Sequence, residues 1–324
     1  MKKINLLLIA VTPIVLMACG GNEGEGGENA VPSGESVQKV DIDKQYEKAV
    51  TAMQNLDAVG FRMAGEMKTV SNTNQAIAFS GTEQNASTSV LIEISNFSAE
   101  AAIKNIQAKD VKAIDASLEA SGDCTYKVEI EPTDPDDSAN KNLNERVSAS
   151  AYIDDGYVYA DLRGLQGFVD AIYPTSASTN MKIKSQLSDI ENGESEIDFE
   201  DSLESFQQYS SDVDFVKGSN GTYSYVFTID PAKVLDQNQA GAISSSNFHV
   251  DGNSNFYLSF NESGFVSAGI LLDWETSGVV NETYYSISVS TSVHVNLKVN
   301  YLYGNDVKVK EVQDKSAYVE QTLQ

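Results

Sequence analysis

Cysteine and histidine are scarce in this chain of 324 residues. It has two cysteines, Cys19 and Cys124, and two histidines, His249 and His294, which are far apart in the sequence. Two cysteines cannot build a disulfide framework, so the stability of the fold must come from a hydrophobic core. Neither histidine has cysteines or clustered carboxylates at metal-ligand spacing, and no nucleophile elbow, phosphate loop or zinc-protease motif occurs. The sequence therefore predicts a protein that is not an enzyme and has no cofactor.

Basic residues are also few. The chain has 22 Lys and Arg against 47 Asp and Glu, which gives a formal net charge of −25. Such an anionic surface argues against nucleic acid as a partner and against electrostatic docking to anionic lipid headgroups. The acidity is typical of a surface that keeps a protein soluble, and any membrane attachment must come from another feature.

The first 18 residues have the pattern of an export signal. Lys2 and Lys3 precede a short apolar run that ends at Met17, and the small residue Ala18 follows. A charged start, an apolar run and a small residue at the cleavage site are typical of a secretory signal. The run is about a dozen residues long, whereas a transmembrane helix needs about 20. We therefore expect residues 1–18 to be a signal peptide that is removed.

The residues Leu16-Met17-Ala18-Cys19 resemble the bacterial lipobox. In that motif the cysteine thiol takes a diacylglycerol and becomes the first residue of the mature protein. The resemblance implies lipidation of Cys19 and stable anchoring, because two acyl chains hold a protein on a membrane. An ordinary signal peptide that ends near a cysteine is the alternative. The expected location is extracytoplasmic, with a lipid anchor in the cell membrane or outer membrane.

The segment after the anchor is a tether. Residues 19–38 are rich in glycine and glutamate and have almost nothing apolar to bury. Such a segment cannot offset the entropy lost on folding, so we predict a flexible acidic linker. Residues 39–324 are enough for one large β-rich domain or two modest ones. We predict a single domain.

Apolar residues recur at every second position through most of this domain. One amphipathic helix comes first, around Tyr46 to Leu56, with Asp41 or Asp43 as its N-cap. The alternating segments that follow are Phe61–Met67, Val90–Ile94, Phe97–Ile103, Ile114–Ala120, Cys124–Ile130, Val147–Ile153 and Tyr223–Ile229. Each has one face for a core and one for water, which predicts an antiparallel sheet. Cys124 is on an apolar side and is expected to be buried.

The turns and the remaining helices complete this prediction. Hairpin turns are expected at Asp155-Gly156, Asn220-Gly221, Ser263-Gly264 and Gly304-Asn305. Further helices are expected at residues 165–173, 198–209 and 231–237.

The segment from Tyr285 to Tyr303 is the most informative. One of its faces is apolar apart from Thr291, and the other is polar and includes His294. At about 3.3 Å per residue it forms roughly 60 Å of one-sided strand, which must bend. The predicted fold class is α+β: a large, curved antiparallel sheet, or open half-barrel, with a wet convex face and helices covering the apolar concave face.

This order of elements resembles a known group of lipid carriers. An N-terminal amphipathic helix, a meander of long one-sided strands, a helical insertion and final hairpins are similar to the carrier LolA and the lipidated proteins LppX and LprG. The resemblance covers roughly residues 40–312, and the segments Tyr152–Tyr159 and Thr228–Pro231 look similar to stretches in members of the group. It implies a concave apolar cavity that takes lipid acyl chains.

Small residues at inward positions are the direct sequence sign of such a cavity. A filled core would favour larger side chains at these positions. Together with three aromatic residues, the candidate lining is Gly65, Ala99, Ala101, Ala116, Ala149, Ala151, Tyr225, Phe227 and Tyr301. Small residues also allow close packing of helices, and the aromatic ones can pack beneath those helices, so both interpretations stay open.

The predicted function is therefore non-catalytic binding or carriage of a hydrophobic ligand, with lipid the leading class. The alternative is a protein-interaction or sensing module with a packed core, for which the sequence does not identify a partner. We predict no metal site, although residues 134–145 have the spacing of a twelve-residue calcium loop. Ala139 replaces the glycine of that loop, and residues 251–262 produce similar spacing inside a predicted hairpin.

Overall fold

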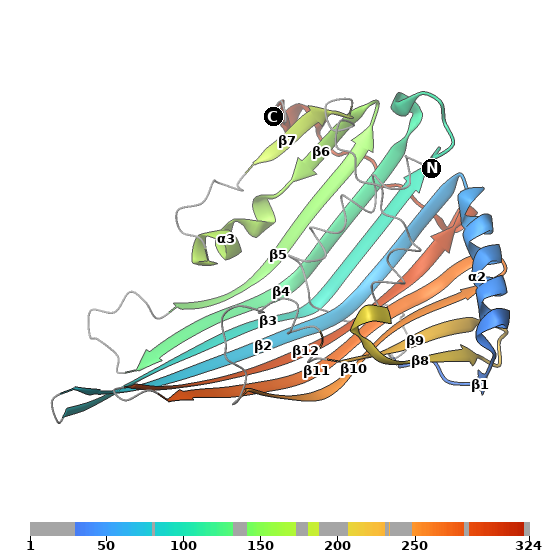
Figure 1. Cartoon of the computed structure of the whole chain (residues 1–324). Coiled ribbons are helices and arrows are strands. Elements are labelled where there is room, and N and C mark those ends of the chain that lie inside the picture. The colour runs from blue at the N-terminus through green and yellow to red at the C-terminus, as the bar shows by residue number, and fades with distance from the viewer. Residues whose placement is uncertain are drawn as a thin grey trace.

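The computed structural model describes residues 30–79, 82–131, 141–172, 181–187, 207–230, 233, 248–281 and 285–320. These residues form one 13-stranded sheet with the strand order β1-β8-β9-β10-β11-β12-β2-β3-β4-β5-β6-β7-β13. Neighbouring strands pair antiparallel, apart from β13 and β7, which pair parallel. The sheet is open and strongly curved (Figure 1), so the predicted fold class is confirmed.

The strands are unusually long. Their bounds are β1 Glu35–Ser36, β2 Ala58–Phe79, β3 Thr82–Lys104, β4 Asp115–Glu131, β5 Lys141–Asp154, β6 Tyr157–Asp161, β7 Lys182–Gln186, β8 Ser210–Lys217, β9 Tyr223–Ile229, β10 Phe248–Asn261, β11 Gly264–Asn281, β12 Tyr285–Tyr303 and β13 Val319–Glu320. The strand β12 has the predicted bounds. Two of the alternating segments that were predicted separately belong to the single strand β3, and two others belong to β4.

A β-bulge joins the two segments of β3. The register between β2 and β3 shifts between Gly65 and Met67, and the register between β3 and β4 shifts between Ser95 and Ser98. Asn96 adopts a left-handed φ of 59° there. An extra residue in one strand bends that strand and restores the alternation beyond it. As a result Ile94 and Phe97 are on the same face.

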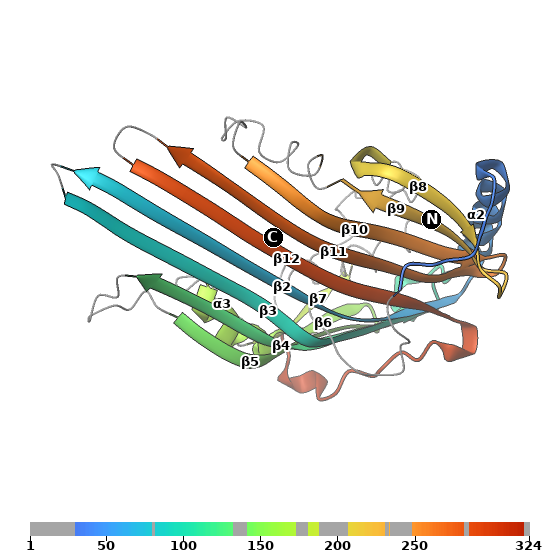
Figure 2. The same ribbon diagram turned by 90° about the horizontal axis from the view of Figure 1, so that it is seen from below.

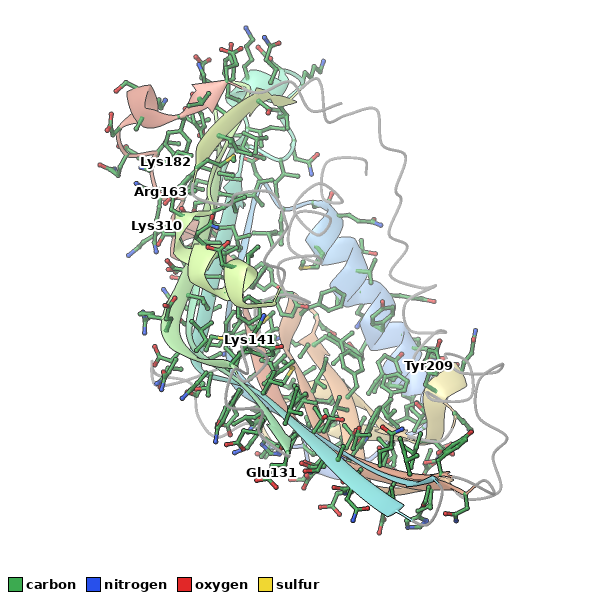
Figure 3. The ribbon with its side chains drawn as sticks, turned by 90° about the vertical axis from the view of Figure 1, so that its left-hand side faces the viewer. Glu131, Lys141, Arg163, Lys182, Tyr209 and Lys310 are labelled. Carbon is green, nitrogen blue, oxygen red and sulfur yellow. The ribbon has the colours of Figure 1, made fainter. Side chains whose placement is uncertain are left out.

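The two faces of the sheet differ because directly paired residues share a face. One row of such pairs runs across the sheet through Tyr225, Leu258, Ala268, Val299, Met63, Ala99, Ala120 and Ala149. We call the face with this row the inner face. Helix α2 (Lys39–Gln54) packs on it through Tyr46, whose ring lies 5.7 Å from that of Tyr225. Figure 2 and Figure 3 show α2 inside the curve of the sheet, so the inner face is the concave one.

Helix α2 buries the stripe Ile42, Tyr46 and Ala49. The predicted helix is thus confirmed, but its predicted cap is wrong: the helix starts earlier, and the N-cap is Gln38, which makes no side-chain cap hydrogen bond. Asp41 lies within the first turn, where its negative charge interacts favourably with the helix dipole and stabilises the helix. Asp43 instead accepts a hydrogen bond of 2.9 Å from the Tyr225 hydroxyl, which ties the helix to the sheet.

The second described helix, α3 (Gln166–Ile172), follows a 3₁₀ turn at Arg163–Leu165 and confirms the helix predicted at residues 165–173. Leu165 and Phe168 pack against Ile94, Cys124 and Val147 on the inner face. Of the other predicted helices, the structure describes residues 207–209, which are helical, and Lys233; their remaining residues lie outside the described part of the chain. No helix among the described residues has the length and apolar character of a membrane span.

The C-terminal segment was not foreseen. Gly304 begins a 3₁₀ turn after β12 rather than a hairpin, so that hairpin prediction is wrong. The chain then crosses the outer face, where Val312 and Tyr318 pack against Tyr152 and Tyr159. Figure 3 shows Lys310 and Lys182 on the side of the sheet away from α2. This part of the convex face is therefore covered rather than wet.

Candidate ligand-binding face

The inner face carries no charged side chain on five adjacent strands, within the residues described. These strands are β11, β12, β2, β3 and β4. The inner positions are every second residue of Ala268–Gly278 in β11, Tyr285–Tyr303 in β12, Val59–Ile77 in β2, Ala86–Ile94 and Phe97–Ile103 in β3, and Ala116–Ile130 in β4. We call this surface the charge-free face.

The opposite face of the same strands is charged. It carries Arg62, Glu66 and Lys68 on β2, Glu93 and Glu100 on β3, Glu119, Asp123, Lys127 and Glu129 on β4, Asp273 and Glu275 on β11, and Lys298 on β12. Several of these charges are paired across strands, as Arg62 is with Glu100 at 3.0 Å and Lys68 with Glu93 at 3.5 Å. On these five strands, every charged side chain at the described positions named for the two faces therefore lies on the outer face.

Packed aromatic rings fill the part of the inner face beneath α2. Tyr225, Phe227, Phe260 and Phe265 form one buried cluster with Ile42, Tyr46 and Ala49 of the helix. Phe227 is 0% exposed. Tyr301 packs against this cluster, with its ring 5.7 Å from that of Phe265, and burial raises its pKa to about 12. The three candidate aromatic residues therefore lie in the packed core.

The candidate small residues lie beside large ones. Ala99 is paired with Met63, and Ala101 is paired with Phe61 and Leu118. Ala99, Ala101 and Ala116 are buried, whereas Ala149 and Ala151 are partly exposed. Alternation of large and small side chains fills space at the buried positions. Gly65 has a different role, because a Cβ atom there would lie 1.9 Å from the carbonyl oxygen of Asn296. A lining role for this set stays a prediction.

Beyond the helices the charge-free face is only partly covered. One row across it consists of Trp274, Val293, Thr69, Ile92 and Tyr126, all of them partly exposed. Farther from α2, Ile77 of β2 and Tyr285 of β12 form a cross-strand pair and are 38% and 41% exposed. The alternation of residues predicted strands in this part of the chain but no site. The missed signal was the absence of charge at the inner positions of every strand.

Hydroxyl groups interrupt the apolar surface near its middle. Ser71 and Thr291 are paired across strands, and their hydroxyl oxygens lie 3.1 Å apart. The Thr276 hydroxyl donates to the carbonyl oxygen of Thr291 at 3.3 Å, and Thr73 is paired with Thr88. These are uncharged donors and acceptors on an otherwise apolar face. They are suited to a neutral polar group, such as an ester or a hydroxyl.

The remaining candidate residues are placed as follows. Cys124 is 0% exposed, and burial with the nearby Glu145 carboxylate raises its pKa to about 11, so its predicted burial is confirmed. His294 is exposed on the outer face, with Nε2 3.7 Å from Glu66, and His249 is also exposed. Within the described ranges no three His, Cys, Asp or Glu residues are grouped to hold a metal ion. Cys19 and residues 134–140 of the calcium-like loop lie outside those ranges.

Comparison with known proteins does not assign a family. No protein-family model matches the chain, and no curated protein matches it. The resemblance to LolA, LppX and LprG therefore stays a prediction.

Solved structures give distant likenesses to β-barrel-like bacterial proteins. The outer-membrane protein OprG from Pseudomonas aeruginosa is 9% identical with a TM-score of 0.19, covering 78% of this chain and 99% of its own. A β-barrel-like DUF1849 protein from Brucella abortus is 7% identical with a TM-score of 0.17, covering 71% and 98%. A DUF1329 protein from Desulfovibrio piger is 11% identical with a TM-score of 0.11, covering 85% and 98%. Likeness at this level carries no functional inference.

Proposed function

We propose that this protein is an extracytoplasmic lipoprotein, anchored through Cys19, that binds or carries a hydrophobic ligand, with lipid the leading class, without catalysis. The charge-free face is the observation that supports the proposal. In a chain with 69 charged residues (22 basic and 47 acidic), one face of five neighbouring strands has no charge where it is described. Water-facing sheet surfaces normally carry polar and charged side chains. A face without charge suits an apolar occupant.

The dimensions of this face fit acyl chains. Strands lie about 4.8 Å apart and rise about 3.3 Å per residue, so the face is roughly 20 Å wide and about 50 Å long between Phe61 and Ile77. Each methylene group that leaves water contributes about 0.8 kcal/mol. Extended contact along the sheet can therefore hold a ligand whose chains are only partly enclosed. The hydroxyl groups of Ser71, Thr276 and Thr291 would meet its neutral polar part.

A second candidate function is supported by the core beneath α2. The aromatic cluster there and the buried alanines Ala99 and Ala101 indicate packing without room for a ligand. In this alternative the protein is an interaction or sensing module, and its partly exposed apolar face contacts another protein.

The experiment that separates the two is native mass spectrometry with lipid extraction. A soluble form beginning at Ala30, made in a bacterium and purified without detergent, is expected to carry lipid in a fixed ratio. After the lipid is stripped, the same form should take up added lipid. An empty, folded protein that takes up no added lipid would favour the interaction module.

The anchor has its own test. Extraction of the full chain from bacterial membranes, followed by mass spectrometry of its N-terminal peptide, is expected to give a mature chain that begins at Cys19 and carries a diacylglycerol. The resemblance to the lipobox gives this expectation its reason. An unmodified N-terminus at another residue would contradict the anchor and leave the ligand proposal standing.

A further inference from the structure

We infer that a lipid enters and leaves the charge-free face at its end farthest from α2, past the exposed pair Ile77 and Tyr285. This inference rests on the proposed function. The two residues face each other on β2 and β12 and belong to the inner face. We call them the distal pair. The occupant is an acyl chain that moves between a bilayer and the sheet.

The inner face is closed at its other end on the strands beneath α2, which are β9, β10 and β11. Phe227 and Phe260 are 0% exposed, and Phe265 is 2% exposed, in the cluster beneath α2. The rings of Tyr46 and Phe260 lie 5.5 Å apart, and the hydrogen bond from Tyr225 to Asp43 fixes the helix over them. A chain that passed here would have to disrupt this packing, at a cost of several kcal/mol. The distal end has no comparable barrier among its described residues.

The distal end is also suited to contact with a bilayer. The strands β2, β3, β11 and β12 extend beyond their neighbours on the side away from α2 (Figure 2). The inner positions between Thr69 and Ile77 carry no charge, so no charged group must lose its water as a chain passes. Tyr285 adds an aromatic ring with a polar hydroxyl, which favours the interface between lipid and water.

The N-terminal part of the described chain joins the sheet at the end opposite the distal pair. The first described residues lead to β1, where Glu35 is paired with Lys217 on β8 and Val37 donates to the carbonyl oxygen of Phe215. These residues lie beside the closed cluster. The tether of a chain anchored through Cys19 would therefore join the domain at the end opposite the distal pair.

The test uses the full chain and measures rates as well as equilibrium. The protein is incubated with phosphatidylcholine vesicles that contain pyrene-labelled diacylglycerol, and loading and unloading are followed by fluorescence. The variants Ile77→Lys and Tyr285→Lys are expected to slow both steps at least tenfold, because a lysine ammonium group at this end must lose water as an acyl chain passes it. The equilibrium amount bound should fall by less than the rates do, because the distal pair forms only the last contact of the charge-free face.

The matched control is Val279→Lys. Val279 lies on β11 near the same end and is 41% exposed, but it is paired with Ser288 on the outer face. Its rates should equal those of the wild-type chain. Equal rates in Ile77→Lys, Tyr285→Lys and the control would overturn the passage while leaving lipid binding intact. A wild-type chain that never loads would overturn the proposed function itself, and this inference with it.

Discussion

The variant Ile92→Glu is expected to take up at least tenfold less lipid than the wild-type protein. Ile92 lies in the middle of the charge-free face, paired with Thr69 on one side and Tyr126 on the other. A carboxylate there must stay hydrated, since the described residues of these five strands include no cation at an inner position that could pair with it. Water held at that position keeps an acyl chain off the neighbouring strands. A tenfold loss corresponds to about 1.4 kcal/mol, which is modest for placing a charge in an apolar contact.

The adjacent residue provides a matched control. Leu91 is also partly exposed, but it lies on the outer face, where it is paired with Val70 and Lys127. The variant Leu91→Glu should bind lipid as the wild type does. Uptake is measured with the soluble form beginning at Ala30, and thermal unfolding confirms that both variants are folded. Equal loss of uptake in the two variants would show that the face has no special role.

The sheet could be predicted because period-two alternation is a local signal. The run from Tyr285 to Tyr303 alternates apolar and polar residues apart from Thr291, and its length alone requires a bent sheet. Where the alternation changes phase, the same signal fails. Ile94 and Phe97 are three positions apart, a spacing that predicts two strands, whereas the bulge at Asn96 keeps both residues in the single strand β3. A bulge depends on the partner strand, which a single segment does not reveal.

The candidate site could be predicted only in part, for a similar reason. That Ala99 and Ala101 are on an inward face follows from alternation. Their neighbours do not: Met63 and Phe61 lie beside them only through the register of β2 and β3. The charge-free face likewise becomes visible when five strands are set side by side. The C-terminal segment gave no local signal, because its contacts join Lys310 to Glu119, at 2.6 Å, across most of the chain.

Gly65 is where this dependence on register has its largest consequence for stability. Its small size and inward position predicted a place in the lining of a cavity, but its backbone has a φ of +156° and lies against β12. In the variant Gly65→Ala the new Cβ would lie 1.9 Å from the carbonyl oxygen of Asn296 and 2.6 Å from the Cα of Leu297. Backbone atoms cannot rotate away, so the two strands must separate locally or the bulge must shift.

The expected cost of Gly65→Ala is about 3 kcal/mol, which combines overpacking with a positive φ that alanine adopts poorly. For a domain of this size it corresponds to a fall of roughly 5–10 °C in the midpoint of thermal unfolding. Gly221→Ala is the control, since Gly221 has a φ of +81° but nothing within 4 Å of its Cβ position. It should lose about 1 kcal/mol, from the backbone alone. If both variants lost the same small amount, the close approach of β2 to β12 at the bulge would be wrong, and with it the register that places Met67 and Thr69 on the charge-free face.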